Sequence, residues 1–192
     1  MVRSYLDHGL GEFLDQVAAR QPAPGGGAVA AVTVSLAASL VAMAARYSAD
    51  LLDDSEQMSD DAERLKARAS GLVDDDAAAY GEVISAYAAL RDADGETDRA
   101  MLTAALTGAA EVPLSIADAG AETAELAARL AADGKPDVRG DAATAVLLAD
   151  AATRAAVHLV AVNVAAGGAE SNLTARVTDC VRRAQEAARS VG

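Results

Sequence analysis

Residues 25–45 read GGGAVAAVTVSLAASLVAMAA, a run of 21 residues without a charge. Its composition favours a helix, because alanine is the best helix former and loses no side-chain freedom on burial. The run is long enough to cross a membrane, which takes about 20 residues. Most of its side chains are small, however, whereas a lipid-facing helix draws its insertion energy from Leu, Ile, Phe and Val. The run therefore predicts a long central helix that other helices of the protein bury.

The rest of the chain extends this pattern. About a quarter of the 192 residues are alanine, and only 3% are aromatic, with no Trp and a single Phe. Small side chains let helices approach closely but each supplies little buried area, so we expect many contacting faces and self-association. The length suits one domain, and no repeat or linker divides it. Residues 1–192 are therefore expected to form a single helical domain.

The charge balance argues against two classes of function. The chain has 16 basic and 29 acidic residues, which give a formal net charge of −13. Binding to nucleic acids and docking on anionic membranes both depend on basic surfaces, so neither is expected. The single cysteine, Cys180, cannot close an intramolecular disulfide, and the N-terminus lacks the apolar core of a signal peptide. We expect a cytoplasmic protein.

Periodicity and helix-breaking residues predict an all-α fold, a bundle of six to seven helices around the long buried one. The third helix is the clearest, with residues at steps of three and four on one face between Leu65 and Leu90. Pro113 suits the first turn of a helix and is expected to separate two helices. The expected helices cover residues 10–20, 26–47, 56–90, 97–110, 112–132, 141–166 and 171–190.

Three glycines at the start of the long helix are the first candidate for a site. Gly25, Gly26 and Gly27 follow Pro24, and within a helix each glycine costs about 1 kcal/mol relative to alanine. They allow a tight turn between packed helices, which is the favoured local interpretation. They also let a ligand approach the bare N–H groups of a helix N-terminus. Their spacing matches neither the dinucleotide-binding fingerprint nor the P-loop.

Asp76 lies on the apolar face of the third helix, whereas Asp74 and Asp75 fall outside that face. A buried carboxylate needs a partner, because an unpaired charge in an apolar setting is costly. Tyr80, one turn later, is one possible donor, and an arginine from another helix is the alternative. Paired with arginine, Asp76 would be structural. In an apolar setting it would suit a general acid or base near neutral pH, and both interpretations stay open.

Two polar residues mark the ends of the expected helix 141–166. Asp141 follows Arg139 and Gly140, where an aspartate makes an excellent N-cap, and this interpretation is favoured locally. Asn163 lies in the apolar run LVAVNV, where a buried amide needs partners. It either orients a ligand or ties two helices together. Two histidines and one cysteine offer no plausible zinc site.

Taken in order, these residues resemble the cyclodeaminase/cyclohydrolase family. This family comprises the cyclodeaminase domain of formiminotransferase-cyclodeaminase and the related bacterial methenyltetrahydrofolate cyclohydrolases. The resemblance covers nearly the whole chain. It rests on Phe13-Leu14, the stretch PAPGGGA from Pro22, the stretch DAAAY from Asp76, Val112-Pro113-Leu114, and Gly140-Asp141 with Asn163 downstream.

The resemblance implies an all-helical homodimer that binds folate in a cleft and acts on a one-carbon unit carried by tetrahydrofolate. The reaction would be either cyclodeamination of the 5-formimidoyl form or hydrolysis of the 5,10-methenyl form, and neither needs a metal or a cofactor. Asp76 and Asp141 would be the proton-handling pair. The substrate-binding residues would be Gly25, Gly26, Gly27, Tyr80, Arg139 and Asn163.

The chain departs from the family pattern in three places. Ala28 and Gly140 stand where the family commonly has serine, and a lysine expected after the third helix is missing from RDADG at residues 91–95. These changes leave open an alternative, a catalytically inactive folate-binding or helical interaction protein on the same scaffold. Because the folate tail is anionic, local basic residues are also expected. The candidates are Arg46, Lys135, Arg139 and Arg154.

Overall fold

The computed structural model describes residues 3–93, 95–167 and 172–192. These residues form six α-helices and two short 3₁₀ turns and contain no strand, which confirms the expected all-α fold. The α-helices are α1 (Leu10–Ala18), α2 (Gly26–Tyr47), α3 (Ser55–Ala93), α4 (Glu96–Asp133), α5 (Arg139–Gly167) and α6 (Asn172–Arg189). The turns are η1 (Tyr5–Asp7) and η2 (Pro136–Val138).

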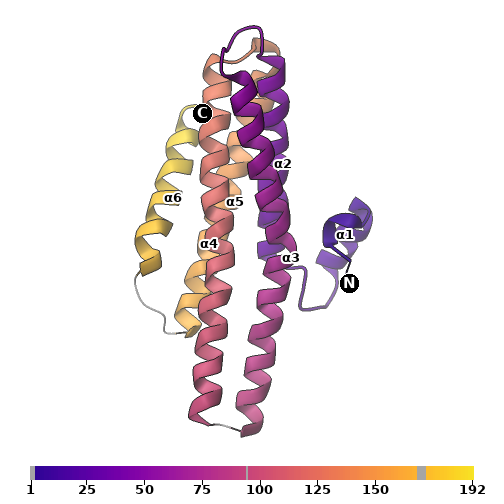
Figure 1. Cartoon of the computed structure of the whole chain (residues 1–192), viewed down its shortest axis with the longest axis vertical. Helices are drawn as coiled ribbons and strands as arrows, with labels where there is room; N and C mark the ends of the chain where they lie inside the picture. The colour runs from indigo at the N-terminus through magenta and orange to yellow at the C-terminus, as the bar shows by residue number, and fades with distance from the viewer. Residues whose placement is uncertain (1–2, 94, 168–171) are drawn as a thin grey trace.

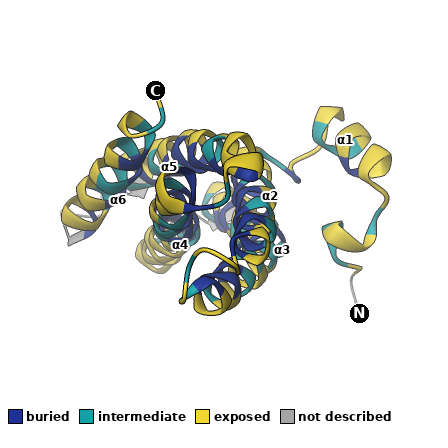
Figure 2. Cartoon of the chain, turned by 90° about the horizontal axis from the view of Figure 1, so that it is seen from above, coloured by how far each residue is buried: buried dark blue, intermediate teal, exposed yellow. Residues whose placement is uncertain are grey.

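Helices α2, α3, α4 and α5 run alongside one another as a long bundle (Figure 1). The helix α6 packs on the outside of α4 and α5, while α1 stands away from the bundle on the other side (Figure 1). The predicted central helix α2 packs against α3, α4 and α5, and twelve of its residues are buried (Figure 2). Because α3 and α4 are the longest helices, their connected ends extend past α2 and α5 (Figure 1).

Pro113 does not separate two helices, so that expectation was wrong. The helix α4 is continuous, with Pro113 buried inside it. A proline inside a helix has no N–H to donate, and it leaves the carbonyl four residues earlier without its helical partner. That carbonyl belongs to Ala109, and Nδ2 of Asn163 donates a hydrogen bond to it at 2.7 Å. A side chain from α5 therefore satisfies the group that the proline frees, and α4 continues.

Small residues set the distance between α4 and α5. Gly120 is buried on α4, and a Cβ atom there would overlap Oγ1 of Thr153 on α5. It would also lie 3.3 Å from the carbonyl oxygen of Ala149. Thr153 is fully buried, and its hydroxyl donates to that same carbonyl at 2.8 Å, so it has little freedom to move away. The close helix approach predicted from the alanine-rich composition is present here.

Ion pairs fasten the polar helix α6 to α4. Arg183 binds both carboxylate oxygens of Glu125, at 2.6 and 2.8 Å, and Arg176 pairs with Asp118 at 2.6 Å. The thiol of Cys180 donates to the other oxygen of Asp118 at 3.0 Å. Burial, reinforced by this carboxylate, raises the pKa of the Cys180 thiol to about 12. Cys180 is therefore protonated at neutral pH.

Three helical segments have the length and hydropathy to cross a membrane. They are α2, α4 and residues 136–166, with mean hydropathy of 2.1, 1.4 and 1.6, and the protein buries 56%, 39% and 44% of their apolar windows. The helices α2 and α5 also expose large apolar side chains. Leu36, Leu147 and Val162 are all at least half exposed. The bundle of one chain therefore covers only part of its apolar surface.

Gly120→Ala is expected to lower the free energy of unfolding by about 1–3 kcal/mol, because the added methyl group overpacks the α4–α5 contact. Gly108→Ala is the matched control in the same helix, since a Cβ atom there meets nothing within 4 Å. It is expected to raise the free energy of unfolding by up to about 1 kcal/mol. Urea unfolding followed by circular dichroism measures both, and equal effects would contradict a close contact at Gly120.

Candidate active site

A pocket of about 310 Å³ lies where the start of α2 meets α3, α4 and the end of α5. Its lining consists of Pro22, Ala23, Gly25, Gly26 and Gly27 around the start of α2, Asp76, Ala79 and Tyr80 of α3, Ala109 of α4, and Leu159, Val162 and Asn163 of α5. Among these described residues, Asp76 is the only one with a charged side chain. The pocket is therefore a mostly apolar chamber that contains one carboxylate.

The first turn of α2 holds Asp76. Its Oδ2 atom accepts a hydrogen bond from the backbone N–H of Ala28 at 3.0 Å. The described residues include neither an arginine nor Tyr80 among its hydrogen-bond partners, so both partners considered from the sequence were wrong. The N-cap residue Gly25 has no side chain to cap α2, and Asp76 supplies the carboxylate from another helix instead. A negative charge at a helix N-terminus is also favoured by the helix dipole.

Gly27 is required by this contact. A Cβ atom at Gly27 would overlap Oδ1 and Cγ of Asp76 and would lie 2.7 Å from Oδ2. Any other residue would push the carboxylate out of its position. At Gly26, by contrast, a Cβ atom would meet only the side chain of Leu159, at 3.8 Å, which is an ordinary contact. The glycines therefore do more than form a tight turn, because they let Asp76 reach the backbone of α2.

Burial raises the pKa of the Asp76 carboxyl above its ordinary value of 3.8, and the hydrogen bond from Ala28 partly opposes this effect. A raised pKa makes a carboxylate a better proton acceptor, which favours general acid–base chemistry. Among the described residues, Oδ1 accepts no hydrogen bond, so this oxygen is available to a ligand. The described residues contain no cluster of three or more His, Cys, Asp or Glu placed to hold a metal ion.

The amide of Asn163 is oriented by α4. Nδ2 donates to the Ala109 carbonyl that Pro113 frees, so the amide oxygen points away from that carbonyl. Both Ala109 and Asn163 line the pocket. Asn163 therefore ties two helices together and also presents an amide of fixed orientation to the pocket. This role of Pro113 was missed in the sequence. Its signal was a proline inside a helical pattern, combined with one amide in an apolar run.

Asp141 and Arg139 lie away from this pocket. The helix α5 begins at Arg139, so Asp141 is in the first helical turn and the expectation that it is the N-cap was wrong. Asn163 is 22 residues further on, which is about 33 Å along the helix. Arg139 lines a different groove, formed with the C-terminal residues. Within one chain, the expected pair of Asp76 and Asp141 is not brought together.

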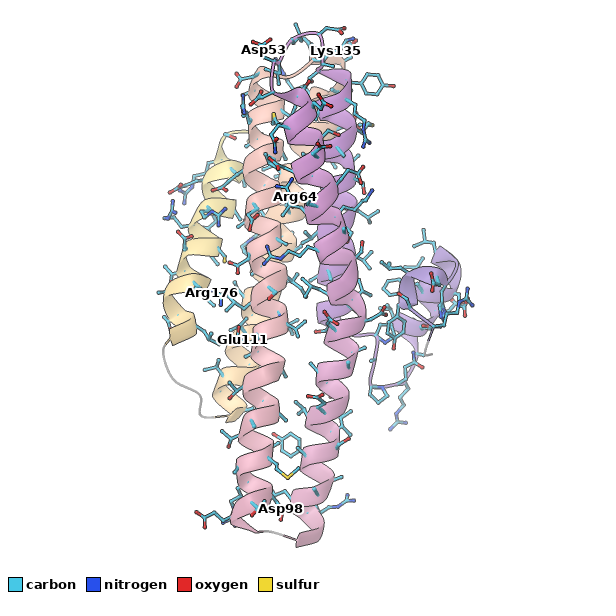
Figure 3. All side chains as sticks on the ribbon, in the orientation of Figure 1. Asp53, Arg64, Asp98, Glu111, Lys135 and Arg176 are labelled. Carbon is cyan, nitrogen blue, oxygen red and sulfur yellow. The ribbon has the colours of Figure 1, made fainter. Side chains whose placement is uncertain are left out.

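The basic residues considered for an anionic ligand do not line the pocket either. Arg46 pairs with Glu63 at 2.7 Å, and Arg154 pairs with Asp150 at 2.9 Å. Lys135 follows the end of α4 and lies at the opposite end of the bundle from the connection between α3 and α4 (Figure 3). Any positive charge that an anionic ligand requires must therefore come from elsewhere.

The sequence profile of the formiminotransferase-cyclodeaminase family matches residues 9–180. The chain is 33% identical to the methenyltetrahydrofolate cyclohydrolase of Methylorubrum extorquens over 159 residues, which are 79% of this chain and 76% of that protein. It is 34% identical to the formimidoyltransferase-cyclodeaminase of Rattus norvegicus over 124 residues, which are 60% of this chain and 23% of that longer protein.

A solved structure is similar over almost the full length. It is that of formiminotetrahydrofolate cyclodeaminase from Thermotoga maritima, with a TM-score of 0.86 and 25% sequence identity. The match covers 96% of this chain and 93% of that chain. The helical fold described above is therefore shared with a protein of nearly the same extent.

Gly27→Ala is expected to lower the free energy of unfolding by about 1–3 kcal/mol, because the methyl group displaces the Asp76 carboxylate from the N–H of Ala28. Gly26→Ala, in the same turn, is the matched control and is expected to change stability by no more than about 1 kcal/mol. Urea unfolding of both variants provides the comparison. Equal losses would mean that the Asp76 contact does not explain the glycine.

Pro113→Ala is expected to give the Ala109 carbonyl its helical hydrogen bond and so release the amide of Asn163. The side-chain amide protons of Asn163, followed by NMR, should then exchange faster with solvent than in the unmodified protein. The backbone fold should persist, since alanine is compatible with a helix interior. Unchanged protection of the Asn163 amide would show that the proline does not control its orientation.

Proposed function

The chain belongs to the formiminotransferase-cyclodeaminase family, and on this premise we propose that it is a methenyltetrahydrofolate cyclohydrolase working in the pocket around Asp76. Its general class is folate one-carbon enzymes, in line with the names of its relatives. The choice of cyclohydrolase is supported by the Methylorubrum extorquens relative, which is 33% identical and of which this chain spans 76%.

The observation that carries the proposal is the single carboxylate in an otherwise uncharged pocket. The one-carbon unit of 5,10-methenyltetrahydrofolate is part of a positively charged amidinium group. A carboxylate in an apolar chamber stabilises such a cation strongly, because the low local dielectric strengthens their attraction. The absence of basic side chains among the described lining residues fits the same ligand.

Hydrolysis requires a group that first accepts and then donates a proton. Water adds to the methenyl carbon while Asp76 takes one of its protons. The bond from this carbon to N5 then breaks as Asp76 returns a proton to N5, and the new hydroxyl loses its proton to solvent. The products are the 10-formyl form and one released proton. The raised pKa of the Asp76 carboxyl favours these roles, because it makes the carboxylate a better proton acceptor than an ordinary aspartate.

A cyclodeaminase is the second candidate, favoured by the match to the Thermotoga maritima protein over nearly its whole length. In that reaction N10 attacks the formimidoyl carbon and gives up its proton to the terminal nitrogen. The terminal nitrogen takes a second proton from the enzyme, its bond to the carbon breaks, and it leaves as ammonia, which gives the cationic 5,10-methenyl form. Asp76 would again be the proton donor. The two reactions share the same acid–base group, so assays with both substrates are needed to separate them.

A homodimer would complete the site. The adjacent helices α2 and α5 expose Leu36, Leu147 and Val162, and Val162 lines the pocket. The pocket and Asp141 lie at opposite ends of α5. In a dimer whose two-fold axis crosses this exposed face at right angles to the helices, the two copies run antiparallel. One end of each bundle then lies beside the other end of its partner. Such a dimer would bring the partner's Asp141 toward the pocket and restore the proton-handling pair.

Asp76→Asn is expected to reduce kcat by about 100-fold or more, because general acid–base catalysis contributes that much. Hydrolysis is followed by the absorbance of 5,10-methenyltetrahydrofolate, and cyclodeamination by ammonia release from the 5-formimidoyl form. Asp75→Asn is the matched control, since Asp75 is exposed on the same helix, and it should keep full activity. Correctly folded unmodified protein without either activity would overturn the proposal.

Mixing two inactive variants tests the shared site. Asp76→Asn and Asp141→Asn are each expected to be inactive as homodimers, whereas a heterodimer keeps one intact site. An equal mixture after subunit exchange should recover about a quarter of the original activity, since half of the dimers are heterodimers with one working site. Differently tagged subunits verify that heterodimers form. Heterodimers without activity would contradict a site built from both copies.

A further inference from the structure

Given the proposed folate substrate, on which this inference rests, the pocket around Asp76 is too small for the whole ligand. Its volume of about 310 Å³ is at the lower end of the range for small-molecule sites. That volume suits the fused rings of a pterin. The p-aminobenzoyl-glutamate tail must therefore leave the pocket and lie on a surface next to it.

An apolar stripe leaves the pocket along α3. Tyr80 lines the pocket, and Ile84 and Tyr87 follow at steps of four and three, which place all three side chains on one face of the helix. We call these three residues the tyrosine stripe. Their exposed fractions are 48%, 40% and 49%, although the chain has only four tyrosines. The stripe runs toward the C-terminal end of α3, which is the end that extends past α2 and α5 (Figure 1).

The stripe leads to a basic residue. Arg91 is four residues after Tyr87, so it lies on the same face of α3, and it is exposed. It is 11 residues from Tyr80, which is about 16 Å along the helix. The nearby acid Glu82 lines a separate groove with Ser85 and Met101. Moving outward from the pocket, a ligand would meet aromatic side chains first and a positive charge second.

We propose that the tyrosine stripe and Arg91 bind the p-aminobenzoyl-glutamate tail of the substrate. The tail has an aromatic ring next to the pterin and carboxylates beyond it, in the same order as the side chains along α3. The ring packs against Tyr80 and Tyr87 in the offset or edge-to-face arrangements that aromatic groups favour. Arg91 pairs with a carboxylate of the glutamate. The positive charge that the pocket lacks is thereby supplied at a distance from the cationic one-carbon unit.

Tyr87→Ala tests the ring contact. It is expected to raise the KM for 5,10-methenyltetrahydrofolate about two- to tenfold while kcat stays within about twofold, because an aromatic contact made in ground and transition states alike is lost. Tyr87→Phe keeps the ring and should restore the KM. Tyr47→Ala is the matched control, since Tyr47 is 56% exposed at the far end of α2, and it should leave the KM unchanged.

Arg91→Gln tests the charge. It is expected to raise the KM for the folate substrate about two- to fivefold, as for loss of an exposed ion pair. The methenyl form of tetrahydropteroate, which has the ring but no glutamate, should be unaffected by Arg91→Gln and still sensitive to Tyr87→Ala.

Active unmodified enzyme with an unchanged KM in Tyr87→Ala and Arg91→Gln would overturn the tail site and leave the proposed function standing. So would a change of oligomeric state in Tyr87→Ala by size-exclusion chromatography, because the stripe would then be a subunit contact. Unmodified protein that turns over neither folate substrate would overturn the proposed function and the tail site together.

Discussion

The contact between the Asp76 carboxylate and the first turn of α2 is the interaction on which the pocket depends. It joins α2 to α3 where the chain enters the bundle after α1, and it caps a helix whose own N-cap residue is a glycine. Gly27 leaves the space that the carboxylate occupies. One contact thus explains a glycine-rich turn and an acid on an apolar helix face. The raised pKa of that acid comes from burial, and the hydrogen bond from Ala28 partly opposes it. The carboxylate that caps α2 is also the one charged group among the described residues that line the pocket.

A second structural feature, a helix defect, supplies the other polar group of the pocket. Pro113 removes one hydrogen bond from α4, and the carbonyl it frees at Ala109 fixes the amide of Asn163 from α5. Such a carbonyl, left unpaired in a packed bundle, would cost free energy, so the proline and the asparagine depend on each other. Asp76 and Asn163 therefore reach the pocket from different helices. A backbone group of α2 orients Asp76, and a backbone group of α4 orients Asn163. Their positions are set by rigid helices rather than by loops, as a precise site requires.

Much of the fold was predictable from the sequence because alanine-rich helical periodicity is a local property. The central helix α2, the long α3 and the position of Asp76 on the apolar face of α3 all follow from spacing along one element. That Asp76 meets the glycine turn was implied only by the family resemblance, because this contact joins two helices. The helix break expected at Pro113 was wrong because proline usually starts or ends a helix. The helix tolerates Pro113 because Asn163, which is distant in sequence, donates to the carbonyl that the proline frees. Asp141 and the basic residues could not be placed either, since periodicity does not say which end of a 29-residue helix faces a pocket. The homodimer remains a proposal that the exposed apolar side chains of α2 and α5 support.

Burial beside the start of α2 raises the pKa of the Asp76 carboxyl, and this shift favours its proposed role as the acid–base group of the pocket. The most direct measurement is an NMR titration of the side-chain carboxyl carbon of Asp76 in the folded protein, with the resonance assigned by its absence in Asp76→Asn. We expect a titration midpoint above the ordinary value of 3.8, because desolvation outweighs the hydrogen bond from Ala28. A midpoint at or below 3.8 would contradict it, since Asp76 would then be a permanently ionised helix cap.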